Sequence, residues 1–185
     1  MKKWMVAGSL LAAVVLLVGI WLSWRRCPES IPVSAELLSA ATGGEVIPEH
    51  QWHAYRSTDL GFAVRFPAVP KRVSHPTGRI YVVADTSDAA YSVSVFSDDG
   101  TSLADRVRGV ASERCNTLVR SEELKVGEGA VEYVMEDPRG GEIGKPVLFL
   151  RRLIRKEGKV YVIGVTVPVG KSAAYQQFVD AFELL

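Results

Sequence analysis

The segment closest to a known ligand-binding motif runs from Gly164 to Ser172 and reads GVTVPVGKS. It ends like a phosphate-binding loop, but such a loop has four residues between its glycines, and here five residues separate Gly164 from Gly170. Those five include three valines and Pro168. β-Branched side chains and a residue without an N–H oppose a loop whose N–H groups turn inward. We therefore expect no nucleotide binding, and we interpret Lys171 and Ser172 as the cap of a final helix.

The histidines provide little basis for metal or acid–base chemistry. His50 and His53 are three residues apart beside Glu49, and His75 is isolated. No third ligand follows at the spacing of a helix-borne zinc motif. No serine lies in a nucleophile-elbow pattern, so a hydrolytic triad has no support in the sequence. We predict no catalytic residue, no metal site and no cofactor.

A run of basic residues is the remaining candidate for a binding site. It lies on one expected hairpin and comprises Arg151, Arg152, Arg155, Lys156 and Lys159. The run has two interpretations. It could face anionic lipid, or it could provide solvated strand ends that discourage pairing between sheet edges.

The elements around these residues follow from the spacing of apolar positions. Alternation of apolar and polar residues and continuous apolar runs between turns predict strands at 52–56, 62–66, 80–84, 90–96, 119–126, 129–136, 146–155 and 160–167. A capping-box spacing from Ser102 to Asp105 begins a helix with an apolar stripe from Leu103 to Leu118. A closing helix is expected at 172–182.

Both arms of the 146–167 hairpin carry apolar residues in both phases, which indicates a central position in a sheet covered on both faces. The strands follow one another through short turns, with one helix midway and one at the end. This order predicts an α+β fold with one large antiparallel sheet and helices against it.

The stretch from Trp4 to Trp24 is expected to be a membrane anchor. It has 21 residues without a charge, and as a helix rising about 1.5 Å per residue it would be about 31 Å long, close to the bilayer core. Tryptophans at both ends suit the membrane interface. Its flanking residues are Lys2, Lys3, Trp4, Trp21, Trp24, Arg25 and Arg26. The two sides of the segment carry nearly equal numbers of positive charges. A short basic tail favours a cytoplasmic N-terminus.

We therefore expect three regions: the transmembrane anchor at 1–26, a tether at 27–50 and an α+β domain at 51–185. Without the four basic flanking residues, the chain has 18 basic and 21 acidic residues. This mildly acidic balance argues against binding to nucleic acid, which needs a basic footprint.

Two cysteines, Cys27 and Cys115, leave two alternatives. They could form a disulfide in an oxidising compartment. The sequence favours the other alternative, with Cys115 as a small buried residue in the helix and Cys27 as an unpaired thiol beside the membrane.

Three local patterns resemble PsbP-like domains and related bacterial proteins. They are GFAVRFPAVP at 61–70, RLIRKEGKVYVIGV at 152–165 and FVDAFEL at 178–184. The resemblance covers about residues 52–185 and implies an α/β/α sandwich around an antiparallel sheet. It also implies a non-catalytic accessory or binding role. We expect a single-pass membrane protein whose domain serves a protein partner at the membrane surface, outside the cytoplasm. The alternative is a tethered enzyme with a pocket built from scattered loop residues.

Overall fold

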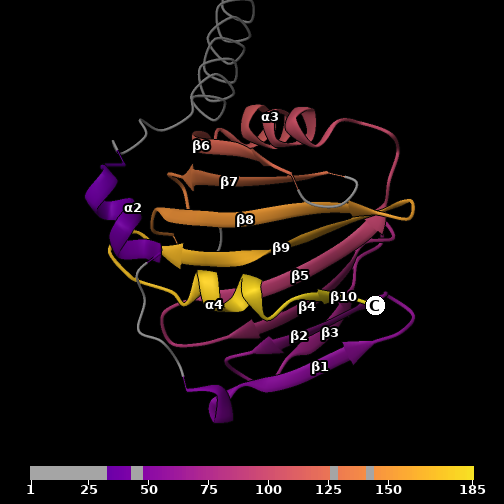
Figure 1. Ribbon diagram of the computed structural model, residues 1–185. Helices are drawn as coiled ribbons and strands as arrows, with labels where there is room; N and C mark the ends of the chain where they lie inside the picture. The colour runs from indigo at the N-terminus through magenta and orange to yellow at the C-terminus, as the bar shows by residue number, and fades with distance from the viewer. Residues whose placement is uncertain (1–32, 43–47, 126–128, 141–143) are drawn as a thin grey trace, which may run out of the picture.

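The computed structural model of the chain describes residues 33–42, 48–125, 129–140 and 144–185. Figure 1 shows two antiparallel sheets and three short helices in these residues. The helices are α2 (Ala35–Thr42), α3 (Leu103–Arg114) and α4 (Tyr175–Asp180), with one 3₁₀ turn at Glu49–Gln51. The strands are β1 (His53–Ser57), β2 (Phe62–Phe66), β3 (Lys71–Ser74), β4 (Ile80–Asp85), β5 (Ala90–Ser97), β6 (Thr117–Leu124), β7 (Ala130–Asp137), β8 (Val147–Lys156), β9 (Lys159–Pro168) and β10 (Glu183–Leu184). The predicted α+β class is confirmed.

The larger sheet has seven strands in the order β3-β4-β5-β9-β8-β7-β6, and neighbouring strands are antiparallel. The β8–β9 hairpin lies near its middle, so the predicted central position of this hairpin is confirmed. Glu157 and Gly158 form the turn with φ angles of 51° and 69°. Two consecutive left-handed residues are typical of a tight hairpin turn that matches the twist of the strands.

One face of the large sheet, the α4 face, carries the main core. Phe178 of α4 is fully buried and lies with its ring centroid 5.1 Å from Phe66 and 5.3 Å from Tyr91. The predicted apolar phase of β2 is confirmed, since Phe62, Val64 and Phe66 are all buried. Both β2 and α4 therefore pack their aromatic side chains against this face.

The prediction of one sheet was wrong, because β1, β2 and β10 form a separate three-stranded sheet. Tyr161 of the large sheet donates a hydrogen bond to the Leu60 carbonyl over 3.0 Å and so joins the two sheets. Strands β3 and β10 were not predicted. All four residues of β3 are exposed, and β10 has only two residues, so neither has an apolar alternation to detect.

The opposite face, the α3 face, is covered by a helix only in part. Helix α3 packs over β7 and β6 (Figure 1). Leu103 and Val107 contact a second, smaller core that includes Met135 and Leu153. Ser102 caps the helix by accepting a hydrogen bond from the Asp105 N–H over 3.0 Å, which confirms the predicted start.

Helix α3 ends earlier than predicted. Cys115 has a left-handed backbone with φ 57°, and this conformation terminates the helix. Leu118 therefore belongs to β6, where it is exposed, and not to the helical stripe. The favoured interpretation of Cys115 as a small buried residue outside a disulfide was also wrong, because Cys115 is disulfide-bonded.

Two further predictions concern the ends of the chain. Lys171 and Ser172 do not cap α4, because this helix begins at Tyr175 and its N-cap residue, Ala174, makes no side-chain cap. Lys171 instead pairs with Asp88 at 3.0 Å. The predicted anchor at Trp4–Trp24, its basic flanks and Cys27 lie outside the described residues. Within the described ranges, no helix is long and apolar enough to cross a membrane.

Candidate binding pocket beneath helix α3

Strands β5 and β9 carry several small residues on the α3 face. The pairing register places Ser92 opposite Gly164 and Ser94 opposite Val162. On the next strand, Arg151 lies opposite Gly164. Beyond it, Tyr133 pairs with Arg151. Larger side chains of β8 and β7 thus stand beside a floor of serine and glycine.

Helix α3 forms a wall above this floor and completes a pocket of about 440 Å³. The pocket size lies within the range of about 300–1,000 Å³ that is common for small-molecule sites. Its aromatic lining comprises Tyr81, Phe96, Tyr133 and Phe149. Its polar lining includes Ser94, Asp105, Asn116, Arg79, Arg106 and Arg151. We call this site the α3 pocket.

Arg151 is the charged group on the floor of the α3 pocket. Its Nη2 donates to Thr166 Oγ1 over 2.7 Å, and its Nη1 donates to the Leu150 carbonyl over 3.3 Å. The guanidinium carbon lies 5.3 Å from the centre of the Phe149 ring, a distance suited to a cation–π contact. Burial lowers the pKa of Arg151, because desolvation disfavours its charged form. Within the described part of the chain, no carboxylate pairs with this guanidinium.

Gly164 makes the position of Arg151 possible. A Cβ atom at residue 164 would lie 2.7 Å from Arg151 Cδ and 2.1 Å from the Leu150 carbonyl oxygen. Any side chain there would push the arginine stem away from the sheet. Glycine is therefore required at this point by close packing, not by its backbone angles.

Phe96 lies between two arginines at the rim of the pocket. The guanidinium carbon of Arg79 lies 4.6 Å from the Phe96 ring centre, and that of Arg106 lies 5.3 Å from it. Arg106 also pairs with Asp99 and, at 3.2 Å, with Asp98. Among the described residues, no carboxylate pairs with Arg79. The rim and the floor of the pocket thus each hold one cation without an acidic partner.

The two remaining polar groups of the lining, Asp105 and Asn116, differ in whether they have hydrogen-bonding partners. Asp105 contacts Arg108 at 2.6 Å and Ser102 at 2.5 Å, and both contacts help to lower the pKa of Asp105. Asn116 has a side-chain amide whose nitrogen and oxygen are both buried and make no hydrogen bond with the residues that the structure describes. A buried amide without partners is costly to a fold. Asn116 is therefore a group that a ligand in the pocket would satisfy.

The structure divides the predicted basic run between the two faces of the sheet. Arg151 faces the α3 pocket, while Arg152 lies in the opposite phase and pairs with Glu132 at 2.7 Å. Arg155 pairs with Asp98 at 2.7 Å. These basic side chains therefore do not share one surface, and contact with anionic lipid stays a prediction.

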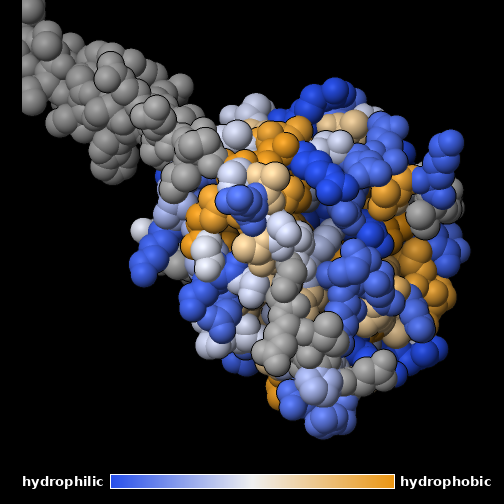
Figure 2. Space-filling view, turned by 60° about the vertical axis from the view of Figure 1, so that its left-hand side comes forward, coloured by the Kyte–Doolittle hydropathy of each residue, from blue (hydrophilic) through white to orange (hydrophobic). Residues whose placement is uncertain are grey.

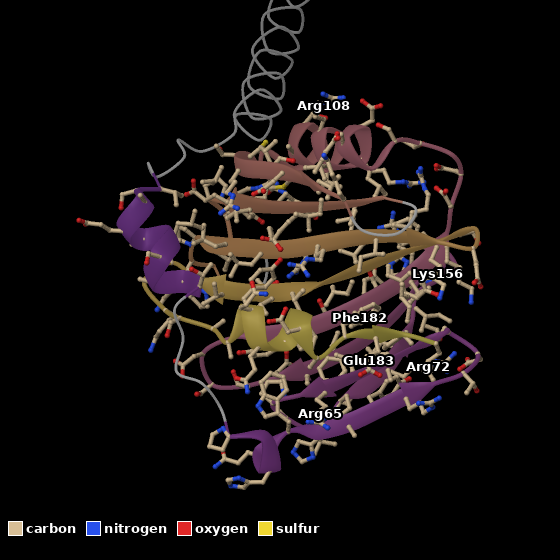
Figure 3. The ribbon with its side chains drawn as sticks, in the orientation of Figure 1. Arg65, Arg72, Arg108, Lys156, Phe182 and Glu183 are labelled. Atoms are coloured by element: carbon tan, nitrogen blue, oxygen red, sulfur yellow. The ribbon has the colours of Figure 1, made fainter. Side chains whose placement is uncertain are left out.

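The two lysines of the run lie at the other end of the hairpin. Lys156 lies beside the β8–β9 turn, on the side of the molecule away from α2 (Figure 3). Lys159 lies 3.4 Å from the carbonyl oxygens of both Asp59 and Leu60. Figure 2 shows one side of the molecule, where hydrophobic residues form separate groups divided by hydrophilic ones.

Among the described residues no histidine lines the α3 pocket, although the centroid of the His75 ring lies 6.3 Å from that of Tyr81, which does line it. His50 and His53 are exposed near the start of β1, and His75 contacts Thr77 at 2.8 Å in the β3–β4 turn. Within the described ranges, no group of three or more metal-ligating side chains is close enough to hold an ion.

Comparisons with known proteins give only distant structural likeness. No family model matches the chain, and no curated protein matches it. The chain is similar to the solution structure of cyanobacterial PsbP (CyanoP) from Synechocystis, with 12% identity and a TM-score of 0.49 over 77% of this chain and 97% of that protein. It is also similar to the Ran-binding protein Mog1p of Saccharomyces cerevisiae, with 11% identity and a TM-score of 0.48 over 72% of this chain and 95% of that protein.

A third similar structure comes from Bacteroides thetaiotaomicron, with 16% identity and a TM-score of 0.48. The match covers 73% of this chain and spans about half, 49%, of that protein. The PsbP-like family that the sequence resembles is thus represented among the similar structures. With TM-scores below 0.5, these likenesses are too distant to indicate a function.

Proposed function

We propose that the chain is a single-pass membrane protein with a non-catalytic binding domain, and that the α3 pocket is its binding site. In this proposal the domain lies outside the cytoplasm and serves as an accessory to a protein partner at the membrane surface. The polar groups that line the pocket support a role in binding. Among the described residues, Arg151 has no carboxylate partner and the Asn116 amide has no hydrogen-bonding partner, and both line a pocket with aromatic walls.

The lining of the pocket favours binding over catalysis. Among the described residues that line it, none is a histidine or a cysteine, and its carboxylate, Asp105, is engaged by Ser102 and Arg108. A tethered enzyme is the alternative function. It would need an acid–base pair or a nucleophile–base pair within hydrogen-bond reach, and the pocket lining offers no such pair among the described side chains.

The disulfide of Cys115 supports a location outside the cytoplasm. Disulfides persist in oxidising compartments and are rare in the cytosol. The chain contains two cysteines, so we propose Cys27 as the partner of Cys115. This bond would fasten the C-terminal end of α3 to the residue that follows the basic flank of the predicted anchor. The α3 pocket would then be held close to the bilayer surface.

Two measurements test the location. Alkaline phosphatase, which is active only after export, is fused to the C-terminus of the 185-residue chain in a bacterial host. We expect an active fusion that stays with the membrane during alkaline carbonate extraction. An inactive fusion would place the domain in the cytoplasm, and release by carbonate would remove the anchor from the proposal.

The protein partner is tested by photo-crosslinking from two positions. A benzoylphenylalanine replaces Arg79 at the pocket rim or, as a control, Arg108 on the exposed side of α3 (Figure 3). We expect one defined crosslinked product from position 79 and none from position 108. The yield of the product from position 79 should be lower in an Arg151→Met background. Equal products from both positions would contradict the role of the pocket in partner binding.

A further inference from the structure

The floor of the α3 pocket combines one cation with a largely apolar surround. Arg151 donates to Thr166 and to the Leu150 carbonyl, which together occupy two of its five N–H donors. Phe149 contacts its face, and Tyr133 stands beside it in the next strand. A desolvated guanidinium without a carboxylate partner is unfavourable unless something anionic joins it.

We propose that the α3 pocket binds a small organic monocarboxylate, with its carboxylate on Arg151 and its apolar body between the aromatic walls. This inference rests on the proposed function of the pocket as a binding site and adds the chemical class of the small molecule that Arg151 holds. In it, the protein partner contacts the rim of the pocket once the small molecule is bound.

The geometry of the arginine favours a carboxylate. A guanidinium presents parallel N–H groups in a planar fork, which matches the two oxygens of a carboxylate. Thr166 and Gly164 position this fork, since the Thr166 hydroxyl accepts a hydrogen bond from Nη2 and Gly164 leaves room for the side-chain stem. The arginine is thus oriented before a ligand arrives, which reduces the entropy cost of binding.

The charge around the pocket favours a single negative charge. Arg106 is neutralised by Asp98 and Asp99, so it adds little net charge. In the charge balance of the lining, the Asp105 carboxylate offsets the Arg79 guanidinium at the rim, which leaves the single positive charge of Arg151. Asn116 offers an amide N–H that needs a partner but adds no charge. A monocarboxylate matches the charge of Arg151 and is repelled less by Asp105 than a dianion would be.

The walls determine what the rest of the ligand must be. Tyr81, Phe96 and Phe149 line the space above the floor. A volume of about 440 Å³ is large enough for a ring or a short chain attached to the carboxylate. A purely polar acid would leave these aromatic surfaces exposed to water, so their burial would add little to its binding free energy.

The test uses the whole 185-residue chain in phosphatidylcholine nanodiscs, with empty nanodiscs as the blank. Isothermal titration calorimetry compares 3-phenylpropanoate with its neutral amide, 3-phenylpropanamide, and with octanoate as an aliphatic acid. We expect the acid to bind at least about tenfold more tightly than the amide, because a hydrogen bond to a charged group is worth about 1.5–3 kcal/mol. The ratio of the dissociation constants of the two acids shows whether the apolar body of the preferred ligand is aromatic or aliphatic. Tighter binding of either acid than of the amide supports the inference.

Three variants assign the effect to Arg151. Arg151→Met is expected to bring the acid down to the affinity of the amide, and Arg151→Lys to retain part of the difference, since lysine keeps the charge but loses the fork. Arg120→Met, at an exposed arginine of β6 that pairs with Glu122 outside the pocket lining, is the control and should match the original chain. If Arg151→Met fails to fold, Thr166→Val removes only a partner of the arginine and is expected to weaken the acid by about threefold.

The outcomes separate the two proposals. Equal binding of acid and amide would overturn the carboxylate inference but leave the pocket as a binding site. No binding of any probe at millimolar concentration would overturn both. Tighter binding of phenyl phosphate than of 3-phenylpropanoate would overturn the choice of a monocarboxylate.

Discussion

Arg151 of β8 lies directly opposite Gly164 of β9, and a methyl group on Gly164 would stand 2.7 Å from Arg151 Cδ. A large cation therefore lies flat on the sheet because its neighbour has no side chain. Arg151 lines the α3 pocket, so this local packing relationship links the centre of the fold to the candidate site.

Replacing Gly164 by alanine should destabilise the domain. The new Cβ would lie 2.1 Å from the Leu150 carbonyl oxygen, which can move only if the central hairpin moves. We expect a loss of about 1–3 kcal/mol in the free energy of unfolding, as for overpacked cores. Urea denaturation followed by circular dichroism measures it.

Gly109→Ala is the matched control. Gly109 lies within α3, and an added Cβ there meets no atom within 4 Å. Alanine should stabilise the helix by about 0.4–1 kcal/mol. Equal effects of the two substitutions would contradict the packing described for Gly164.

Tyr91 supports the start of α4. Its hydroxyl accepts a hydrogen bond from the buried N–H of Ala174 over 3.1 Å, at a helix start that has no side-chain cap. Tyr91→Phe should lower the free energy of unfolding by about 1–3 kcal/mol, because it leaves a buried donor unsatisfied. Tyr81→Phe makes the same chemical change where the structure shows no hydroxyl hydrogen bond, and it should have a smaller effect. A reversed order would contradict the capping role of Tyr91.

Asp59 should titrate at unusually low pH. Hydrogen bonds from Ser57 and from Arg72, whose Nη2 lies 2.8 Å from Asp59 Oδ2, lower the pKa of Asp59 from 3.8 to about 2. A depressed folded-state pKa contributes stability that is present above the unfolded pKa and lost as the pH falls through about 2. Carboxyl ¹³C NMR should give a midpoint near 2, and Arg72→Ala should raise it. A midpoint near 3.8 in the original chain would exclude the predicted contacts.

The chain should have no free thiol group before it is reduced. With Cys115 disulfide-bonded, alkylation of the unfolded, unreduced chain should label no cysteine, and alkylation after reduction should label both. Mass spectrometry of the membrane-extracted protein counts the labels. Two reactive thiols without reductant would contradict the disulfide and weaken the case for an oxidising compartment.

Much of the fold could be predicted because alternation of apolar and polar residues is a strong signal of a β-strand. Strand β2 matches its predicted range, and the β8–β9 hairpin lies at the centre, where its two apolar phases placed it. The small sheet could not be predicted, since β10 has two residues and pairs with β2 across more than a hundred residues of sequence. The end of α3 depends on the left-handed backbone at Cys115, a conformation that is rare for cysteine.

The pocket was missed although one signal for it was present. Arg151 was grouped with its basic neighbours along the chain, yet it shares its phase with Phe149 and Leu153, not with Arg152. Counting the register outward from the predicted turn would have placed it opposite Gly164. The position of α3 over β7, and hence the enclosure of the pocket, depends on tertiary packing that no local pattern contains.

Photoaffinity labelling tests the central claim, that the α3 pocket is the binding site, most directly. A benzoate bearing an aryl diazirine is irradiated with the 185-residue chain in nanodiscs, and labelled peptides are mapped by mass spectrometry. We predict labels within α3 and on the pocket-facing residues of β4, β5 and β8, with 3-phenylpropanoate as a competitor that removes them. Labels on the α4 face or on the β1–β2 sheet, or labels that the competitor does not reduce, would contradict the claim.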